Sequence, residues 1–154
     1  MFKIRESIVQ VEESDQLAPK FDENGLIVVT TLDAKSGEVL MVGYMNKESL
    51  EKTITTREAH YFSRSRKTIW HKGASSGYIQ KVKEILIDDD QDAVCLRVDI
   101  GEKGASCHVG YKSCFYREID LEDTGNKPGL KFKTTEKVFD PKQVYGDEPS
   151  PTKL

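Results

Sequence analysis

The chain has 154 residues, of which 32% are charged, and a mean hydropathy of −0.55, a composition typical of one soluble globular domain. Its longest aliphatic run, residues 26–29, is far shorter than the roughly 20 apolar residues that span a bilayer. The charged N-terminus lacks the apolar stretch of a secretory signal. The net charge of −3 does not indicate a nucleic-acid partner. We therefore expect a cytoplasmic protein that binds neither membranes nor nucleic acid.

The first half of the chain predicts an arm, a hairpin and a helix. Residues 1–23 are polar and weakly patterned, and we expect them to form a loose arm or an edge element. Two short apolar runs, residues 26–32 and 38–44, flank a turn-forming cluster and predict a β-hairpin. Asn46 then stands at an N-cap position, and the apolar spacing that follows predicts one helix over residues 47–59.

Short β-forming segments follow this helix. The element order predicts an α+β fold with a compact, mainly antiparallel or mixed β-sheet and one principal helix. We expect strands over residues 61–62, 68–70, 78–87 and 94–100, a further hairpin turn at residues 101–104, and a strand over residues 113–119.

The C-terminal residues 121–154 contain four of the five prolines and are rich in Lys, Asp, Thr and Gly. This composition predicts an irregular tail that is dispensable for chemistry. The expected organisation is therefore an arm over residues 1–23, one folded domain over residues 24–120, and the tail.

Four carboxylates fall within residues 88–92, directly after an apolar segment. Their mutual repulsion costs stability unless water or a cation screens it. Asp88, Asp90 and Asp92 alternate, so an extended backbone would point them the same way, and their hard oxygen atoms suit Mg²⁺. A solvated strand end is the alternative explanation of this run.

The three cysteines are clustered in the middle of the chain. An odd number of thiols in a reducing compartment favours metal ligation or reactive thiols over disulfides. Catalytic zinc sites keep three protein ligands and an activated water, so Cys95, Cys107 and Cys114 match the expected ligand count. His108 adjoins one thiol and is the best candidate for a general acid or base. Buried, unreactive cysteines are the alternative.

Residues 61–77 combine cationic side chains with serines, two glycines and the single tryptophan. Arginine and hydroxyl groups suit phosphate oxygens, glycine allows close backbone approach, and an indole can cover an aromatic ring. A solvated basic strand is the alternative, but two neighbouring metal candidates favour a nucleotide-like anionic substrate. The candidate substrate-binding residues are Ser63, Arg64, Ser65, Arg66, Trp70, Lys72, Gly73, Ser75, Ser76 and Gly77.

Together and in this order, these motifs resemble phosphoribosyl-AMP cyclohydrolase, an enzyme family of histidine biosynthesis. The resemblance implies a zinc- and magnesium-dependent hydrolase that opens the purine ring of phosphoribosyl-AMP between N1 and C6. It also implies a homodimer in which both subunits contribute zinc ligands. The likeness covers residues 24–119 and rests on residues 63–66, 70–73, 76–77, 107–110 and 113–116 and on the alternating aspartates.

The resemblance also implies roles for single residues. The catalytic domain would be residues 24–120, and the tail is too short for the pyrophosphohydrolase domain that some members carry, so we expect a single activity. Asp88, Asp90 and Asp92 would hold Mg²⁺, Cys107 and Cys114 would bind zinc, and His108 would move the proton as water attacks C6.

One position departs from the family pattern. The family usually has a cysteine directly after the first aspartate as its third zinc ligand, and this chain has Asp89 there. Cys95 lies six residues further on, about 20 Å away along a straight strand, so the two residues cannot fill one ligand position. Either Asp89 gives zinc a carboxylate or a bent chain brings Cys95 in. We favour Cys95, because zinc binds thiolates readily.

Two other functions fit part of the sequence. A non-catalytic zinc module would bind RNA or protein through the basic segment 57–72, with zinc closed by four ligands and no turnover. A zinc nucleobase deaminase also attacks a ring carbon, but its H-x-E and P-C-x-x-C motifs are absent from the sequence.

Overall fold

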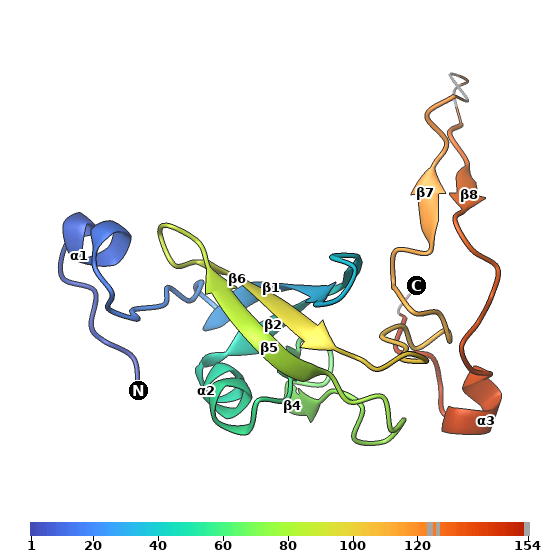
Figure 1. The fold of residues 1–154 in the computed structure, drawn as a ribbon, viewed down its shortest axis with the longest axis horizontal. Coiled ribbons are helices and arrows are strands. Elements are labelled where there is room, and N and C mark those ends of the chain that lie inside the picture. Colours follow the sequence, from blue (N-terminus) through green and yellow to red (C-terminus); the bar gives the residue numbers. More distant parts are fainter. Residues whose placement is uncertain (123–124, 126, 153–154) are drawn as a thin grey trace.

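The computed structural model describes residues 1–122, 125 and 127–152. Its centre is a four-stranded sheet in the order β2-β1-β6-β5 (Figure 1). β1 pairs antiparallel with β2 and parallel with β6, while β5 pairs antiparallel with β6. The predicted α+β class with a mixed sheet and few helices is confirmed. The strands are β1 (Leu26–Asp33), β2 (Val39–Asn46), β5 (Lys81–Ile87) and β6 (Ala93–Asp99).

The predicted hairpin and helix are both present. β1 and β2 form the hairpin, and α2 (Lys47–Thr56) follows it directly. The N-cap is Asn46, whose side chain accepts a hydrogen bond from the backbone amide of Ser49 at 2.9 Å, and Ser49 Oγ accepts one from the Asn46 amide. The helix ends three residues earlier than predicted, because Arg57 adopts a left-handed conformation with a φ of 59°.

The core lies on one face of the sheet, against α2 and the small sheet of β3 (His60–Ser63) and β4 (Thr68–His71). Alternate residues of β6 are buried, as expected for a strand with one face in the core. The buried cluster contains Ile27, Val29, Leu40, Met41, Met45, Leu50, Ala59, Tyr61, Val82, Val94, Leu96, Val98 and Ile100.

Two predictions for the chain after β6 are wrong. Residues 101–104 do not close a hairpin, and of residues 113–119 only β7 (Arg117–Ile119) is a strand, paired with β8 (Leu130–Phe132). Both edges of β6 are already paired, with β1 and β5, so a following strand cannot add to it. Residues 100–116 instead form a loop, the thiol loop, which contacts β2 through a 2.7 Å hydrogen bond from the Cys114 amide to the Leu40 carbonyl.

The two ends of the chain are more ordered than the sequence suggests. The arm contains α1 (Ile8–Glu13), and the tail contains β8 and α3 (Pro141–Tyr145). The buried amide group of Gln91 donates to the Val11 carbonyl at 2.9 Å and accepts from the Ala18 amide at 2.8 Å, which ties the arm to the turn between β5 and β6. Across the described ranges, every helix is too short or too polar to cross a membrane.

Candidate active site

The candidate metal ligands lie along β6: the aspartates before it, Cys107 and Cys114 after it, and Cys95 within it. The acidic turn, residues 88–92, precedes this strand, and the thiol loop follows it (Figure 1). Seven residues of extended chain separate the two regions by about 23 Å. In the part of the chain that the structure describes, the only group of three or more potential ligand side chains is Asp88, Asp89 and Asp90. Neither Asp89 nor Cys95 therefore completes a group with the two loop thiols of the same chain.

The side chains of Cys107 and Cys114 meet within the thiol loop. The turn between them uses Gly110, whose φ of 103° suits glycine, and the Cys107 amide donates to the Tyr111 carbonyl at 3.1 Å. A hydrogen bond between the two thiols lowers the pKa of Cys107 to about 6 and raises the pKa of Cys114. The shift favours the ionised form of Cys107, which is the form that binds zinc.

Lys72 lies beside this pair, and only 5% of its surface is exposed. Its ammonium group donates to the Ser106 carbonyl at 2.7 Å. Burial lowers the pKa of Lys72, while Cys114 and Cys107 act in the opposite direction. A buried cation needs an anionic partner, so the thiolate and Lys72 stabilise each other. Burial and the charge of Lys72 lower the pKa of His108, which keeps its imidazole neutral and able to accept a proton.

A chain of buried hydrogen bonds joins the core to the thiol loop, and no motif in the sequence predicted it. The hydroxyl groups of Thr31 and Tyr61 lie 2.7 Å apart, and Tyr61 donates to Gln80 Oε1 at 2.7 Å. The amide nitrogen of Gln80 donates to Ser106 Oγ at 3.0 Å. Gln80 is fully buried, and its only signal in the sequence was a polar residue at the start of an apolar strand.

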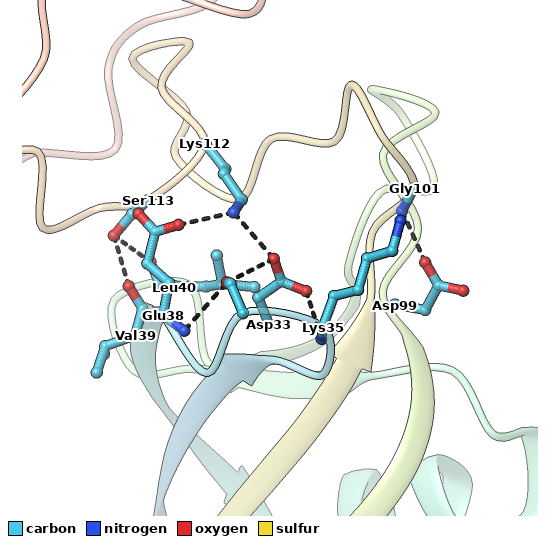
Figure 2. A network of polar contacts seen from close by, with 10 residues as sticks. Asp33, Lys35, Glu38, Val39, Leu40, Asp99, Gly101, Lys112 and Ser113 are labelled. Carbon is cyan, nitrogen blue, oxygen red and sulfur yellow. Dashed lines mark hydrogen bonds and ion pairs between the residues drawn. The ribbon is translucent and has the colours of Figure 1, made fainter.

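A second network holds the thiol loop to the turn between β1 and β2 (Figure 2). Lys112 Nζ lies 2.9 Å from Asp33 Oδ2 and 2.7 Å from Glu38 Oε2. Ser113 Oγ donates to the Val39 carbonyl at 2.6 Å. Burial raises the pKa of Asp33, but hydrogen bonds from Lys112 and from the turn outweigh burial, so the net shift is downward. The loop that carries both thiols is thus anchored to the central sheet.

A cavity of about 500 Å³ is lined by residues of β2, β3, β4 and the β3–β4 turn. Three of the predicted substrate-binding residues, Arg64, Ser65 and Trp70, line it. The guanidinium carbon of Arg64 lies 4.0 Å from the centre of the Tyr44 ring. The Trp70 ring is also 5.1 Å from Lys72 Nζ. Trp70 therefore lies between the cavity and Lys72, the lysine beside the two thiols.

The other predicted substrate-binding residues lie outside the lining of this cavity. Ser63 Oγ accepts hydrogen bonds from the backbone and side chain of Arg66, both at 3.3 Å. The serine turn, residues 75–77, follows β4. Its geometry requires Gly73, because a Cβ there would lie 2.3 Å from the Tyr78 carbonyl oxygen.

The acidic turn is held by contacts of its own. Asp88 Oδ1 accepts hydrogen bonds at 2.9 Å from the backbone amides of Asp92 and the residue after it. Lys20 Nζ lies 3.5 Å from Asp92 and 3.9 Å from Asp90. Burial, followed by Asp92 and Asp88, raises the pKa of Asp90. The close group contains Asp89 in addition to the predicted Asp88 and Asp90, and it leaves out the predicted Asp92.

The remaining cysteine and histidines have other surroundings. Cys95 lies within β6, paired with Thr30 of β1 and Leu86 of β5, and burial raises the pKa of its thiol. The rings of His60 and His71, to which the sequence analysis assigned no role, stack with their centres 4.3 Å apart.

The thiol loop combines an ionisable thiol pair with a buried lysine and a histidine, and Trp70 joins it to a cavity that arginine also lines. This set of side chains fits a hydrolase that acts on an anionic aromatic substrate. The family model for phosphoribosyl-AMP cyclohydrolase matches residues 41–116. A curated phosphoribosyl-AMP cyclohydrolase of Rhodopseudomonas palustris (strain HaA2) is 56% identical over 88% of this chain and 90% of its own length. One from Rhizobium leguminosarum bv. trifolii (strain WSM2304) is 50% identical over 88% and 89%. The chain belongs to the phosphoribosyl-AMP cyclohydrolase family, hydrolases of histidine biosynthesis, and the resemblance drawn from its motifs is confirmed.

Proposed function

We propose that this chain hydrolyses the adenine ring of phosphoribosyl-AMP between N1 and C6, using zinc and magnesium, as a cytoplasmic homodimer. Membership of the family supports the reaction. The observation that carries the residue assignments is the position of the buried Lys72 beside the two thiols: Lys72 Nζ and Cys114 Sγ lie 2.7 and 4.0 Å from the same Ser106 carbonyl oxygen.

The donor set of the thiol loop fits zinc. It offers two sulfur atoms near enough for each to shift the pKa of the other, and the pKa of Cys107 is lowered to about 6. Zinc held there would supply a Lewis acid that makes water a nucleophile near neutral pH.

We infer that the third zinc ligand comes from a second copy of the chain. Within the described residues of one chain, neither candidate lies close to both thiols. Asp89 is exposed in the acidic turn, whereas Cys95 lies inside a paired strand where burial raises the pKa of its thiol. These surroundings favour Asp89, which reverses the preference drawn from the sequence.

Metal analysis of purified variants tests the third ligand. We expect Asp89→Asn to lose bound zinc and Cys95→Ser to keep it, because only the first removes a ligand. Zinc at the wild-type level in Asp89→Asn, or its loss in Cys95→Ser, would contradict the choice of Asp89. A monomeric mass for the active, zinc-bound wild type would contradict a ligand from a second copy.

The carboxylates of the acidic turn fit magnesium, which prefers hard oxygen ligands. Asp88, Asp89 and Asp90 already lie within reach of one ion. Asp92 would have to leave its ion pair with Lys20 to join them. We propose Asp88, Asp90 and Asp92 as the magnesium ligands, as the resemblance implies.

The remaining residues bind substrate and move the proton. Arg64 and Ser65 present a guanidinium and a hydroxyl to phosphate oxygens, and Trp70 offers a ring face to the purine. His108, neutral because burial and Lys72 lower its pKa, takes a proton from the attacking water and delivers it to N1 as the C6–N1 bond breaks. Lys72 holds the thiol loop through Ser106 and stabilises the thiolate.

An absorbance assay with phosphoribosyl-AMP, with and without a chelator, tests the proposal. We expect ring opening that stops when the metal is removed. Lys72→Met should lower kcat/KM about a hundredfold, the size of an effect expected from removing a buried electrostatic group. Lys83→Met should leave it unchanged, because Lys83 is exposed and pairs only loosely with Asp99, at 3.6 Å. Wild-type protein that binds RNA but shows no metal-dependent turnover would support the non-catalytic zinc module instead.

A further inference from the structure

The C-terminal strap, residues 137–145, lies against the thiol loop. The backbone amide of Val138 donates to the Gly110 carbonyl at 2.7 Å, and the amide of Phe139 approaches the same oxygen at 3.4 Å. The approach is so close that a Cβ on Gly110 would lie 2.3 Å from the Phe139 carbonyl oxygen. The strap therefore fixes the thiol loop at a position three residues after Cys107.

The ring of Phe139 contacts a different segment. It stacks on Tyr78 with the ring centres 5.1 Å apart and the planes 17° apart, and Tyr145 of α3 packs against its edge at 6.0 Å. Tyr78 directly follows the serine turn, and its carbonyl closes over Gly73, which lies two residues before that turn. Phe139 thus touches the thiol loop with its backbone and the segment of the serine turn with its ring.

We propose that Phe139 is a positioning residue for the hydrolysis, because it sets the spacing between the thiol loop and the serine turn. Gly110 lies two residues after His108, and Tyr78 lies two residues after Ser76. A shift at the first contact therefore moves the residue proposed to transfer the proton, and a shift at the second moves a serine that the sequence assigns to substrate binding. The strap lies beyond the residues matched by the family model, and the sequence predicted that the tail is dispensable. This inference rests on the proposed function.

The first test removes the ring and keeps the backbone contacts. Phe139→Ala should raise KM for phosphoribosyl-AMP about three- to tenfold, the range expected for one aromatic pair, with kcat within about twofold of the wild-type value. Phe139→Tyr, which keeps a stacking ring, should restore KM. Leu130→Ala, in β8 of the same tail and 54% exposed, should change neither constant.

The second test removes the backbone contact and keeps the ring. Val138→Pro abolishes the amide that donates to Gly110 and should lower kcat about three- to tenfold, the range expected for one hydrogen bond. Thr135→Pro is the matched control, since no described backbone hydrogen bond uses the Thr135 amide. It should leave kcat unchanged.

Urea unfolding of each variant separates positioning from folding. A wild-type KM in an active Phe139→Ala variant would overturn this inference alone. It would also be overturned if the variants lost activity only in proportion to their lowered free energy of unfolding, and if Phe139→Tyr did not restore KM. An inactive wild-type protein would overturn the proposed function, and this inference with it.

Discussion

The acidic turn and the thiol loop are both candidate metal sites, yet they are built in opposite ways. The carboxylates of the acidic turn are largely open to solvent, where water and salt screen their repulsion. In the thiol loop, a buried thiol and a buried ammonium depend on each other, and losing one partner leaves the other uncompensated. Removing one charged partner should therefore have a large effect in the thiol loop, whereas in the acidic turn only the loss of a metal ligand, such as the proposed zinc ligand Asp89, should have one.

Removal of a loop thiol should have the largest effect. Cys107→Ser deletes a proposed zinc ligand and the anion beside Lys72, so we expect loss of bound zinc and a fall in kcat/KM of about a thousandfold. Metal analysis and the absorbance assay measure the two losses. Cys95→Ser is the matched control and should keep both zinc and activity. A Cys107→Ser variant with full zinc would show that the thiol loop is not the zinc site.

Two buried glutamines provide the next comparison, because each joins one of the two regions to the rest of the fold. Gln80→Leu leaves the hydroxyl groups of Tyr61 and Ser106 without their amide partner, and Gln91→Leu releases the arm from the acidic turn. Each should lower the free energy of unfolding by about 2 kcal/mol. Only Gln80→Leu should also lower kcat, measured where both variants remain folded. Equal kcat losses would contradict the difference between the regions.

The anchor of the thiol loop on β1 should show a pH-dependent effect. The pKa of Asp33 is lowered in the fold. Its contribution to the free energy of unfolding is therefore complete above the unfolded pKa of about 3.9, and it is lost as the pH falls through the lower pKa of the folded state. We expect Asp33→Asn to lower the free energy of unfolding by about 1 kcal/mol at pH 7, and the difference from wild type to shrink below about pH 3.9. Urea unfolding across this range measures it. Asp147→Asn, in the exposed end of the tail, should show no such difference, and a difference for Asp33→Asn that is constant with pH would contradict the anchor.

The smallest effect is expected for Lys20, which pairs with two carboxylates of the acidic turn. Lys20→Met removes an exposed ammonium that competes with a cation for Asp90 and Asp92. Magnesium binding, followed by calorimetry, should tighten by only about twofold, because exposed ion pairs are weak. Lys52→Met, which disrupts an exposed pair with Glu48 in α2, should leave magnesium binding unchanged. Weaker binding in Lys20→Met would show that the lysine supports the ion site.

Local signals in the sequence predicted most of the central fold and part of the site. Asn46 predicted the start of α2 because capping depends on neighbouring residues only. The hairpin at residues 101–104 was predicted wrongly because strand pairing depends on which edges are already occupied, a property of distant residues. Gln80 was missed for the same reason, since its partners Tyr61 and Ser106 lie 19 and 26 residues away. The contact of Phe139 with Gly110 is equally non-local.

The length of β6 has a consequence for mixed assemblies. We consider a dimer in which each zinc centre joins the thiol loop of one subunit to Asp89 of the other. Cys107→Ser and Asp89→Asn lie at opposite ends of β6, so in one chain they damage two different zinc centres. A heterodimer of a Cys107→Ser subunit and an Asp89→Asn subunit then has one doubly damaged centre and one intact centre. In cells that lack this enzyme, coexpression of the two inactive chains should restore growth without histidine, whereas either chain alone should not.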